Sequence, residues 1–259
     1  FGSFLFIAQY LQLVLGLTPL QAGLWSLPSA LGFIVSSNVA PRIMPQFRPA
    51  FVLGTCLVVA ALGLGLLTQV GESNGLAIVV AASIVISLAL APVFSLTTEL
   101  IVGSAPPERA GAASGISETA AELGGALGIA LLGSIGIAIY RSGLANGLPA
   151  EVPTEAAAMA RNTLGAALTV ARQLPDGLGV VLLEVARGAF IQGMQVTSAI
   201  SAVVAIGIAI LALVMLRHVP PSSQSQDQTG PHAQEQLTAA ELTAAVEGPA
   251  ATTGAEIVR

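Results

Sequence analysis

The two residues best placed to do chemistry are Glu118 and Glu122, which lie within the long apolar segment 111–140. In a helix they stand about 10 and 16 Å from the start of that segment, and their spacing places both on one helix face. Carboxylates inside a membrane helix are costly and suggest function by default. Two acids this close in lipid should not both ionise readily, so at least one should have a raised proton affinity. The pair therefore predicts a site that exchanges a proton with an organic cation.

In a second interpretation the pair does not exchange protons: Glu118 lies in the interfacial layer, and Glu122 faces a water-filled cavity. Glu99, near the end of segment 76–101, is only a secondary candidate for function. A carboxylate one turn from the membrane interface is readily hydrated, so its presence there needs no functional explanation. Glu108 and Arg109 lie in a turn at a helix start, where an acid favours the helix dipole and an arginine meets lipid headgroups. We expect them to set the topology, with an inward-side gating pair as the alternative.

Polar and aromatic residues of the first two apolar segments are candidates for a substrate cavity. Rings bind a flat, lipophilic cation by cation–π contact, and amides supply hydrogen bonds. The alternative for each ring is packing or an interfacial aromatic belt. The candidates are Gln9, Tyr10, Gln12, Trp25 and Asn38, beside an aromatic cluster of Phe1, Phe4 and Phe6.

The elements that would position these residues are membrane-spanning helices. The 259 residues are 54% hydrophobic and 9% charged, and their mean hydropathy is +0.83, which is too apolar for a typical soluble domain. A spanning helix needs about 20 apolar residues. We predict an all-α integral membrane protein whose region 1–217 is a six-helix bundle, with spans at about 1–17, 21–40, 50–70, 76–101, 111–140 and 189–216.

The arginines predict the orientation of the bundle. Arg42, Arg48, Arg109 and Arg217 fall on one side of an alternating path, and short cytoplasmic loops are enriched in such residues. Segment 141–188 then lies outside the cell, although it carries four arginines of its own. There we predict an amphipathic helical hairpin, with Thr154 capping its first helix, Pro175 ending it and residues 178–185 following; the alternative is a disordered loop. The polar segment 218–259 predicts a disordered cytoplasmic tail.

Several classes of protein are disfavoured by what the sequence lacks. All nine cationic residues are arginine, without a basic patch, so nucleic-acid binding is not expected. The single cysteine, Cys56, and two histidines beyond the last span provide neither a metal site nor a nucleophile–base pair within the bilayer. No Gly-rich loop ending in Lys-Ser/Thr is present for nucleotide phosphates. We therefore expect no enzyme activity, no metal and no cofactor, with protons as the coupling ion.

The chain also starts at Phe1 inside an apolar stretch, which indicates a fragment of a longer protein.

Three stretches together resemble the C-terminal half of the fourteen-helix drug:proton antiporters of the major facilitator superfamily, over about 1–217. They are YLQLVLGLTPLQAGL at 10–24 with Leu27-Pro28 after it, PPERAG at 106–111, and SETAAELGG at 117–125. The last is similar to the penultimate helix of the branch that exports quaternary ammonium compounds and dyes. By this resemblance, Glu118 matches an acid implicated in proton and cation handling, and Glu122 matches a second acid.

The resemblance also implies that the six helices are the ninth to fourteenth of the transporter, that the N-terminal half is missing, and that a long outer loop precedes the last helix. Some members carry an acid in the helix equivalent to 21–40, and none occurs here, which puts recognition of divalent cations in question.

The expected function is a proton-coupled antiporter in the cell membrane that exports lipophilic cationic drugs, with Glu118 as the leading exchange site and Glu122 as its coupled neighbour. One alternative is an exporter of an endogenous antibiotic, lipid or metabolite. A second alternative is a non-transporting membrane scaffold or receptor, in which the glutamates only make interhelical hydrogen bonds.

Overall fold

A computed structural model describes residues 1–43, 46–71, 74–217 and 219, and every element in these ranges is a helix. The predicted tail at 218–259 lies outside the described residues apart from Val219. In chain order, the elements are α1 (Gly2–Gln9), the π-helical turn η1 (Tyr10–Val14), α2 (Pro19–Ile43), α3 (Pro49–Leu67), α4 (Gly75–Gly103), the 3₁₀ turn η3 (Pro107–Arg109), α5 (Ala110–Gly147), α6 (Thr154–Ala160), α7 (Leu164–Ala171) and α8 (Asp176–Met215).

Among the described residues, four stretches of helix are long and apolar enough to cross a membrane: Pro49–Leu67, Gly75–Gly103, Pro107–Gly147 and Gly177–Met215. The helix α2 has 25 residues but is less apolar, because it carries polar side chains such as Ser36 and Asn38. The apolar helix Gly2–Val14 is shorter than a span. The predicted all-α membrane fold is confirmed, and its helices are separated at the Pro- and Gly-rich turns of the sequence.

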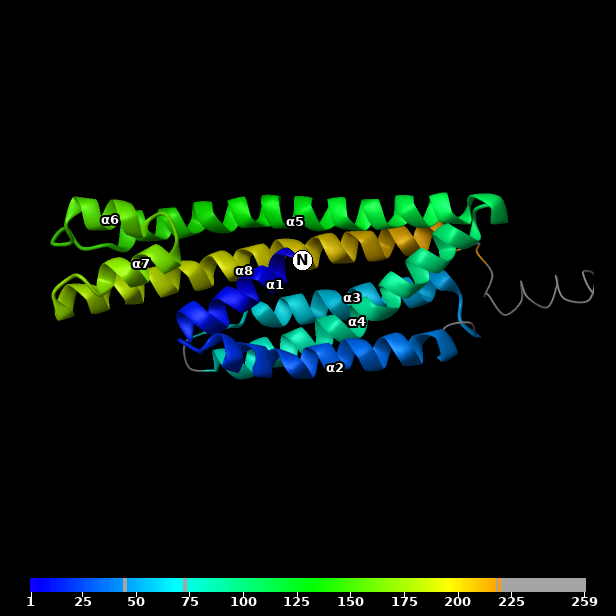
Figure 1. Cartoon of the computed structure of the whole chain (residues 1–259), viewed down its shortest axis with the longest axis horizontal. Helices are drawn as coiled ribbons and strands as arrows, with labels where there is room; N and C mark the ends of the chain where they lie inside the picture. The colour runs from blue at the N-terminus through cyan, green and yellow to red at the C-terminus, as the bar shows by residue number, and fades with distance from the viewer. Residues whose placement is uncertain (44–45, 72–73, 218, 220–259) are drawn as a thin grey trace, which may run out of the picture.

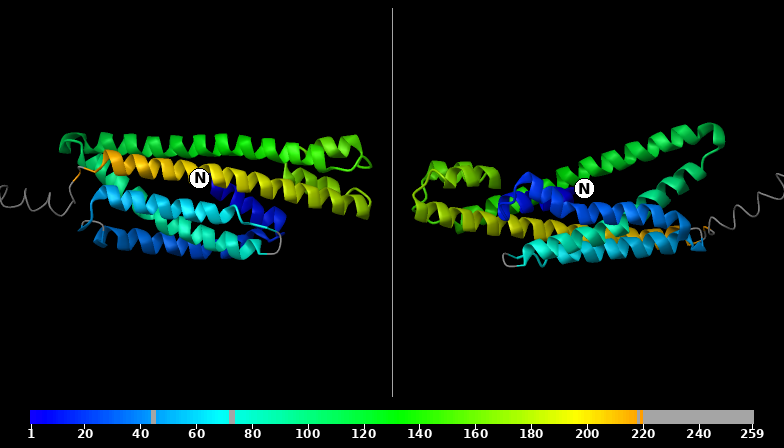
Figure 2. Two further views of the ribbon diagram at one scale, coloured as in Figure 1. Left: turned by 180° about the vertical axis from the view of Figure 1, so that it is seen from behind. Right: turned by 60° about the horizontal axis from the view of Figure 1, so that its bottom comes forward.

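The helices form an elongated, roughly antiparallel bundle (Figure 1). The helix α4 packs between α2 and α3, α3 packs on α8, and α8 packs on α5, while α1 lies against α5 (Figure 2). Small residues permit the closest approaches: a Cβ built on Gly63 would lie 2.7 Å from the Ile86 side chain, and one on Gly54 would lie 2.8 Å from Leu213. Close packing of small residues is how helices associate in lipid.

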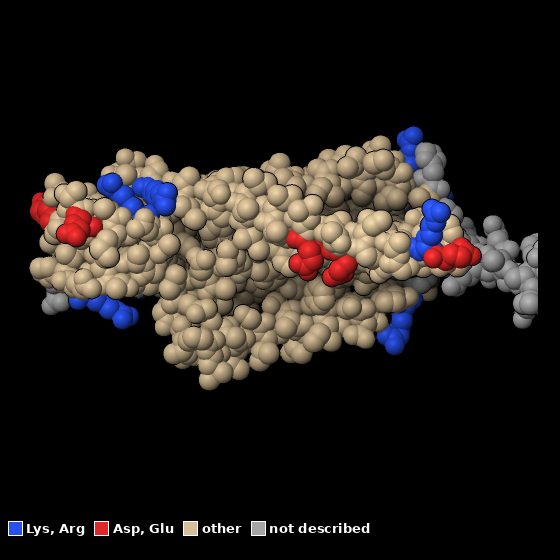
Figure 3. Space-filling view, turned by 45° about the horizontal axis from the view of Figure 1, so that its top comes forward, with Lys and Arg blue, Asp and Glu red and all other residues tan. Residues whose placement is uncertain are grey.

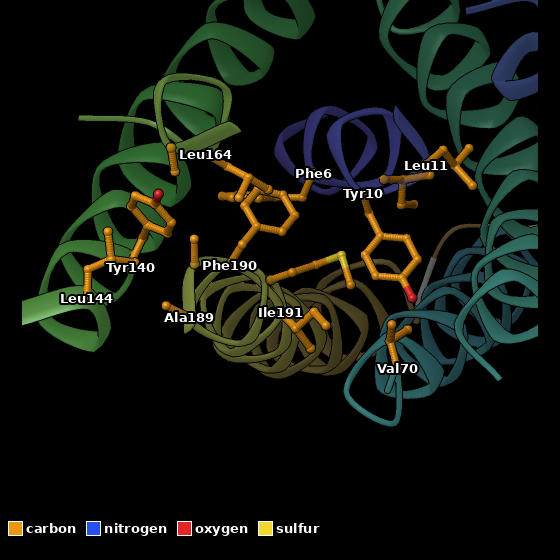
Figure 4. Close-up of a cluster of buried hydrophobic side chains, with 14 of the residues drawn as sticks. Phe6, Tyr10, Leu11, Val70, Tyr140, Leu144, Leu164, Ala189, Phe190 and Ile191 are labelled. Atoms are coloured by element: carbon orange, nitrogen blue, oxygen red, sulfur yellow. The ribbon is translucent and has the colours of Figure 1, made fainter. Parts of the chain in front are cut away.

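Two helices, α5 and α8, extend well beyond the others at the end of the molecule that also holds α6 and α7. We call this the α6 end. The helix α8 has 40 residues, or about 60 Å, whereas a bilayer core is about 30 Å thick. At this end, the Tyr140 hydroxyl donates a hydrogen bond to the Ala160 carbonyl at 2.9 Å. Tyr140 and Leu144 of α5 pack with Leu164 of α7 and Phe190 of α8 in one buried cluster (Figure 4).

The predicted first arm of the helical hairpin, residues 154–175, is two short helices, α6 and α7, in the structure. The first helix is interrupted after Ala160, and Thr163 begins a new one by accepting a hydrogen bond from the Ala166 amide at 3.1 Å. Residues 178–185, the predicted second arm, are the first turns of the long helix α8, which packs against α7. The reason is that no proline interrupts the chain between Asp176 and Met215, so one helix continues through this stretch.

Candidate functional site

The glutamates Glu118 and Glu122 stand one turn apart on α5, and both side chains are exposed in the described part of the chain. Charged side chains gather at the two ends of the molecule, and acidic side chains interrupt the uncharged band between them (Figure 3). Glycines on the same half of α5, including Gly111, Gly115 and Gly124, would meet no described atom within 4 Å if they carried a Cβ. The glutamate-bearing part of α5 is therefore not packed by the described residues of this chain.

The helix α1 meets α5 one turn beyond Glu122. The ring of Phe1 lies against Gly125, where an added Cβ would stand 3.1 Å from the ring. Further along, Phe6 packs against Gly136, which has no room for a Cβ. Absence of a side chain at these two glycines lets the phenylalanine rings of α1 contact the backbone of the glutamate helix.

Four phenylalanine rings line a cavity of about 360 Å³. Phe1 directly precedes α1, and the other three rings are Phe4 of α1, Phe33 of α2 and Phe94 of α4. Ser87 and Leu90 of α4 complete the lining. The described lining residues carry no charged side chain, so the cavity suits flat, apolar ring systems.

A second cavity of about 210 Å³ shares Phe1 and Phe4 with the first and is also lined by Gly124 and Gly128 of α5. Gly124 follows Glu122 by two residues. Phe1 and Phe4 thus lie between the phenylalanine cavity and the glutamate helix α5. The rings of the cavity are therefore close to the part of α5 that carries the two carboxylates.

The remaining predicted cavity residues take varied positions. Gln9 lines a cavity of about 130 Å³ together with Tyr140 and Phe190. Tyr10 is fully buried, and its hydroxyl donates a hydrogen bond to the Gly71 carbonyl at 3.1 Å. The other three side chains are exposed: Gln12 in η1, Trp25 in α2, and Asn38, whose amide donates to the Ile34 carbonyl of its own helix at 2.7 Å. The structure therefore does not bring these five residues together.

The secondary and topological candidates lie near the end of the molecule opposite α6. Glu99 is exposed near the end of α4, and Glu108 and Arg109 are exposed in η3, which precedes α5. Within the ranges that the structure describes, no group of three or more His, Cys, Asp or Glu side chains could hold a metal ion.

Sequence reasoning missed Phe33, Ser87, Leu90 and Phe94 as cavity residues. A signal was available for three of them, because residues 87, 90 and 94 follow the i, i+3, i+7 spacing of one helix face. The spacing alone did not reveal that this face turns toward Phe33 of α2 and the N-terminal rings of α1.

Residues 1–129 match the family model of the Major Facilitator Superfamily. The chain is 36% identical to the multidrug efflux pump LfrA of Mycolicibacterium smegmatis over 216 residues, which are 83% of this chain and 42% of that protein. It is 31% identical to the tetracenomycin C resistance and export protein of Streptomyces glaucescens, over 88% of this chain and 43% of that one. It is also 31% identical to the methyl viologen resistance protein SmvA of Salmonella typhimurium, over 73% of this chain and 38% of that protein. The chain spans about two fifths of the length of these relatives.

Proposed function

The chain belongs to the Major Facilitator Superfamily, whose members are membrane transporters, and from this premise we propose that it is part of a proton-coupled antiporter that exports lipophilic cationic drugs. The proposal assigns the phenylalanine cavity to the substrate's rings and α5 to its charge. It places the protein in the cell membrane as a multi-pass transporter.

The observation that carries this proposal is the contact of α1 with α5. Phe1 lines the phenylalanine cavity and also packs on Gly125, one turn from Glu122. A lipophilic cation needs an apolar surface for its rings and a negative group for its charge, and a ring face adds cation–π attraction. Both requirements are met within a few residues of the same contact.

The proposed exchange of a proton for the drug cation depends on the charge of Glu118 and Glu122. A carboxylate that has lost its proton attracts the cation, and a carboxylate that has gained a proton no longer does. Binding of a proton to one of the pair therefore releases the cation, and binding of the cation requires that the proton leaves. Glu118 is the leading exchange site in this scheme, and Glu122, one helical turn away on the same face of α5, is its neighbour in the exchange.

The direction of export depends on the orientation of the bundle, for which the arginines provide support. Arg42 ends α2, Arg48 precedes α3, Arg109 precedes α5 and Arg217 follows α8, and these helix ends lie together opposite the α6 end (Figure 1). We place this arginine-bearing end in the cytoplasm. Protons then enter from the α6 end and the cation leaves there.

The test is ethidium efflux from energised cells that express the full-length transporter, with and without a protonophore. We expect protonophore-sensitive efflux that Glu118→Gln abolishes at unchanged expression. The matched control is Glu155→Gln, which removes an exposed acid of α6 far from the phenylalanine cavity and should leave efflux unchanged. Normal efflux by Glu118→Gln would remove this residue from the mechanism.

A second candidate function is export of an uncharged polycyclic antibiotic. It is favoured by the uncharged lining of the phenylalanine cavity, and one relative is named for tetracenomycin C export. A substrate panel separates the two functions: ethidium and methyl viologen represent cations with one and two charges, and a neutral polycyclic antibiotic represents the alternative. Efflux of the neutral compound alone would favour the second function.

A further inference from the structure

A cavity of about 420 Å³ lies between η1 and the first turns of α8, away from the phenylalanine cavity and the glutamates. Four of its lining residues are apolar and two are charged: Val14, Leu15, Val180, Leu183, Glu184 and Arg187. The lining is thus amphipathic, unlike the uncharged phenylalanine cavity.

The cavity is located where a membrane surface is expected. Val14 ends η1 and Leu15 follows it, and the chain then reverses at Gly16, whose φ is +69°, before α2 begins at Pro19. A turn between two membrane helices lies at the boundary of the hydrocarbon, because its free backbone groups need water or headgroups. The charged side of the cavity lies on the part of α8 that continues past this turn toward the α6 end.

Arg187 is the unusual feature of this cavity. Its side chain is partly buried, and its Nε atom is buried without a hydrogen-bond partner in the described part of the chain. A buried donor that lacks a partner is costly, and an arginine keeps its charge at all relevant pH values. The guanidinium therefore favours an anionic acceptor that enters the cavity from outside the chain.

Glu184 supplies the opposite charge in the same cavity. It lies three residues before Arg187 on α8, so the two side chains share a helix face, yet no ion pair joins them in the described structure. A ligand that carries an anion and a cation close together can match both groups. A purely anionic ligand would leave Glu184 facing a like charge.

We propose that this cavity binds an aminophospholipid such as phosphatidylethanolamine. The phosphate accepts hydrogen bonds from the Arg187 guanidinium, the primary ammonium donates to the Glu184 carboxylate, and the glycerol and upper acyl chain contact Val14 and Leu183. Arginine is suited to phosphate through its fork of donors. Phosphatidylcholine fits less well, because its quaternary ammonium has no N–H to donate.

The experiment measures lipid retention by the purified full-length transporter. The protein is equilibrated with equimolar phosphatidylethanolamine, phosphatidylcholine and phosphatidylglycerol, and the bound lipids are counted by native mass spectrometry. We expect phosphatidylethanolamine to be retained preferentially, and Arg187→Gln to reduce that retention by roughly tenfold or more, as loss of a hydrogen bond to a charged group would. Arg161→Gln, at an exposed arginine between α6 and α7, is the matched control and should retain the lipid.

A second variant tests the role of the ammonium. Glu184→Gln should remove the preference for phosphatidylethanolamine over phosphatidylcholine while phosphate-dependent retention persists. Equal retention of all three lipids by the unmodified protein, or unchanged retention by Arg187→Gln, would overturn the proposal. Displacement of the lipid by soluble glycerophosphoethanolamine at equal concentration would also overturn it, because the apolar lining would then contribute nothing. None of these outcomes depends on drug export.

Discussion

The contact between α5 and α8 predicts a specific cost for adding one methyl group at Gly193. A Cβ built there would lie 3.0 Å from the carbonyl oxygen of Gly136 and 3.6 Å from its Cα. Both atoms belong to the backbone of α5, so neither can move by a side-chain rotation. Gly193→Ala therefore requires α5 and α8 to separate by a few tenths of an ångström along their contact.

The expected loss in free energy of unfolding is best measured with a matched pair of substitutions, Gly193→Ala and Gly207→Ala. Overpacking a close contact costs about 1–3 kcal/mol. Replacing glycine by alanine within a helix gains about 1 kcal/mol through helix propensity. Gly207→Ala receives the same gain on the same helix, and a Cβ there would meet no described atom within 4 Å. The difference in free energy of unfolding between the two variants should thus be about 1–3 kcal/mol, with Gly193→Ala the less stable.

The assay is reversible denaturant unfolding of the purified full-length transporter, followed by intrinsic fluorescence, for both variants side by side. Equal stability of Gly193→Ala and Gly207→Ala would refute the close contact of α5 with α8 at this position. Because the same contact fixes α5, Gly193→Ala should also reduce drug efflux more than Gly207→Ala does.

Two further predictions concern the α6 end and the phenylalanine cavity. Tyr140→Phe removes the hydrogen bond to the Ala160 carbonyl and leaves that buried carbonyl without its partner, so it should destabilise the α6–α7 pair by about 1–2 kcal/mol and speed limited proteolysis between α5 and α8. Gly125→Val displaces the ring of Phe1 from its contact with α5, so the KM for ethidium efflux should rise severalfold while expression stays unchanged. An unaltered KM would show that this ring does not contact the substrate.

Much of the fold followed from the sequence, because lipid imposes simple rules on length and polarity. Apolar runs of about 20 residues had to be helices, and the Pro- and Gly-rich turns between them, such as 105–109, had to lie outside the hydrocarbon. The prediction was less successful where helices leave the membrane. The sequence places Arg141 and Arg187 in the outer segment 141–188, but α5 and α8 continue through them, since helix ends beyond the hydrocarbon tolerate charge.

The glycines of α5 show why close packing was harder to predict than the spans. The spacings Gly111–Gly115 and Gly124–Gly128 are typical of a helix face that packs closely in lipid, yet none of these four would contact a described atom within 4 Å through a Cβ. The contacts with α8 are instead made further along, where Gly143 meets Ala189 and Gly147 meets Val185. Spacing alone cannot reveal which glycine row faces a neighbour, because that depends on the rotation of the helix.

The two halves of α5 differ in how they are packed, and this difference bears on the proposed function. The second half of α5 is held against α8 through glycines and against α1 through Phe6, whereas the half that carries Glu118 and Glu122 is not packed by the described residues of this chain. The contact of Phe1 with Gly125 lies at the border of the two halves, so a ligand in the phenylalanine cavity would lie between the fixed part of α5 and its acidic part.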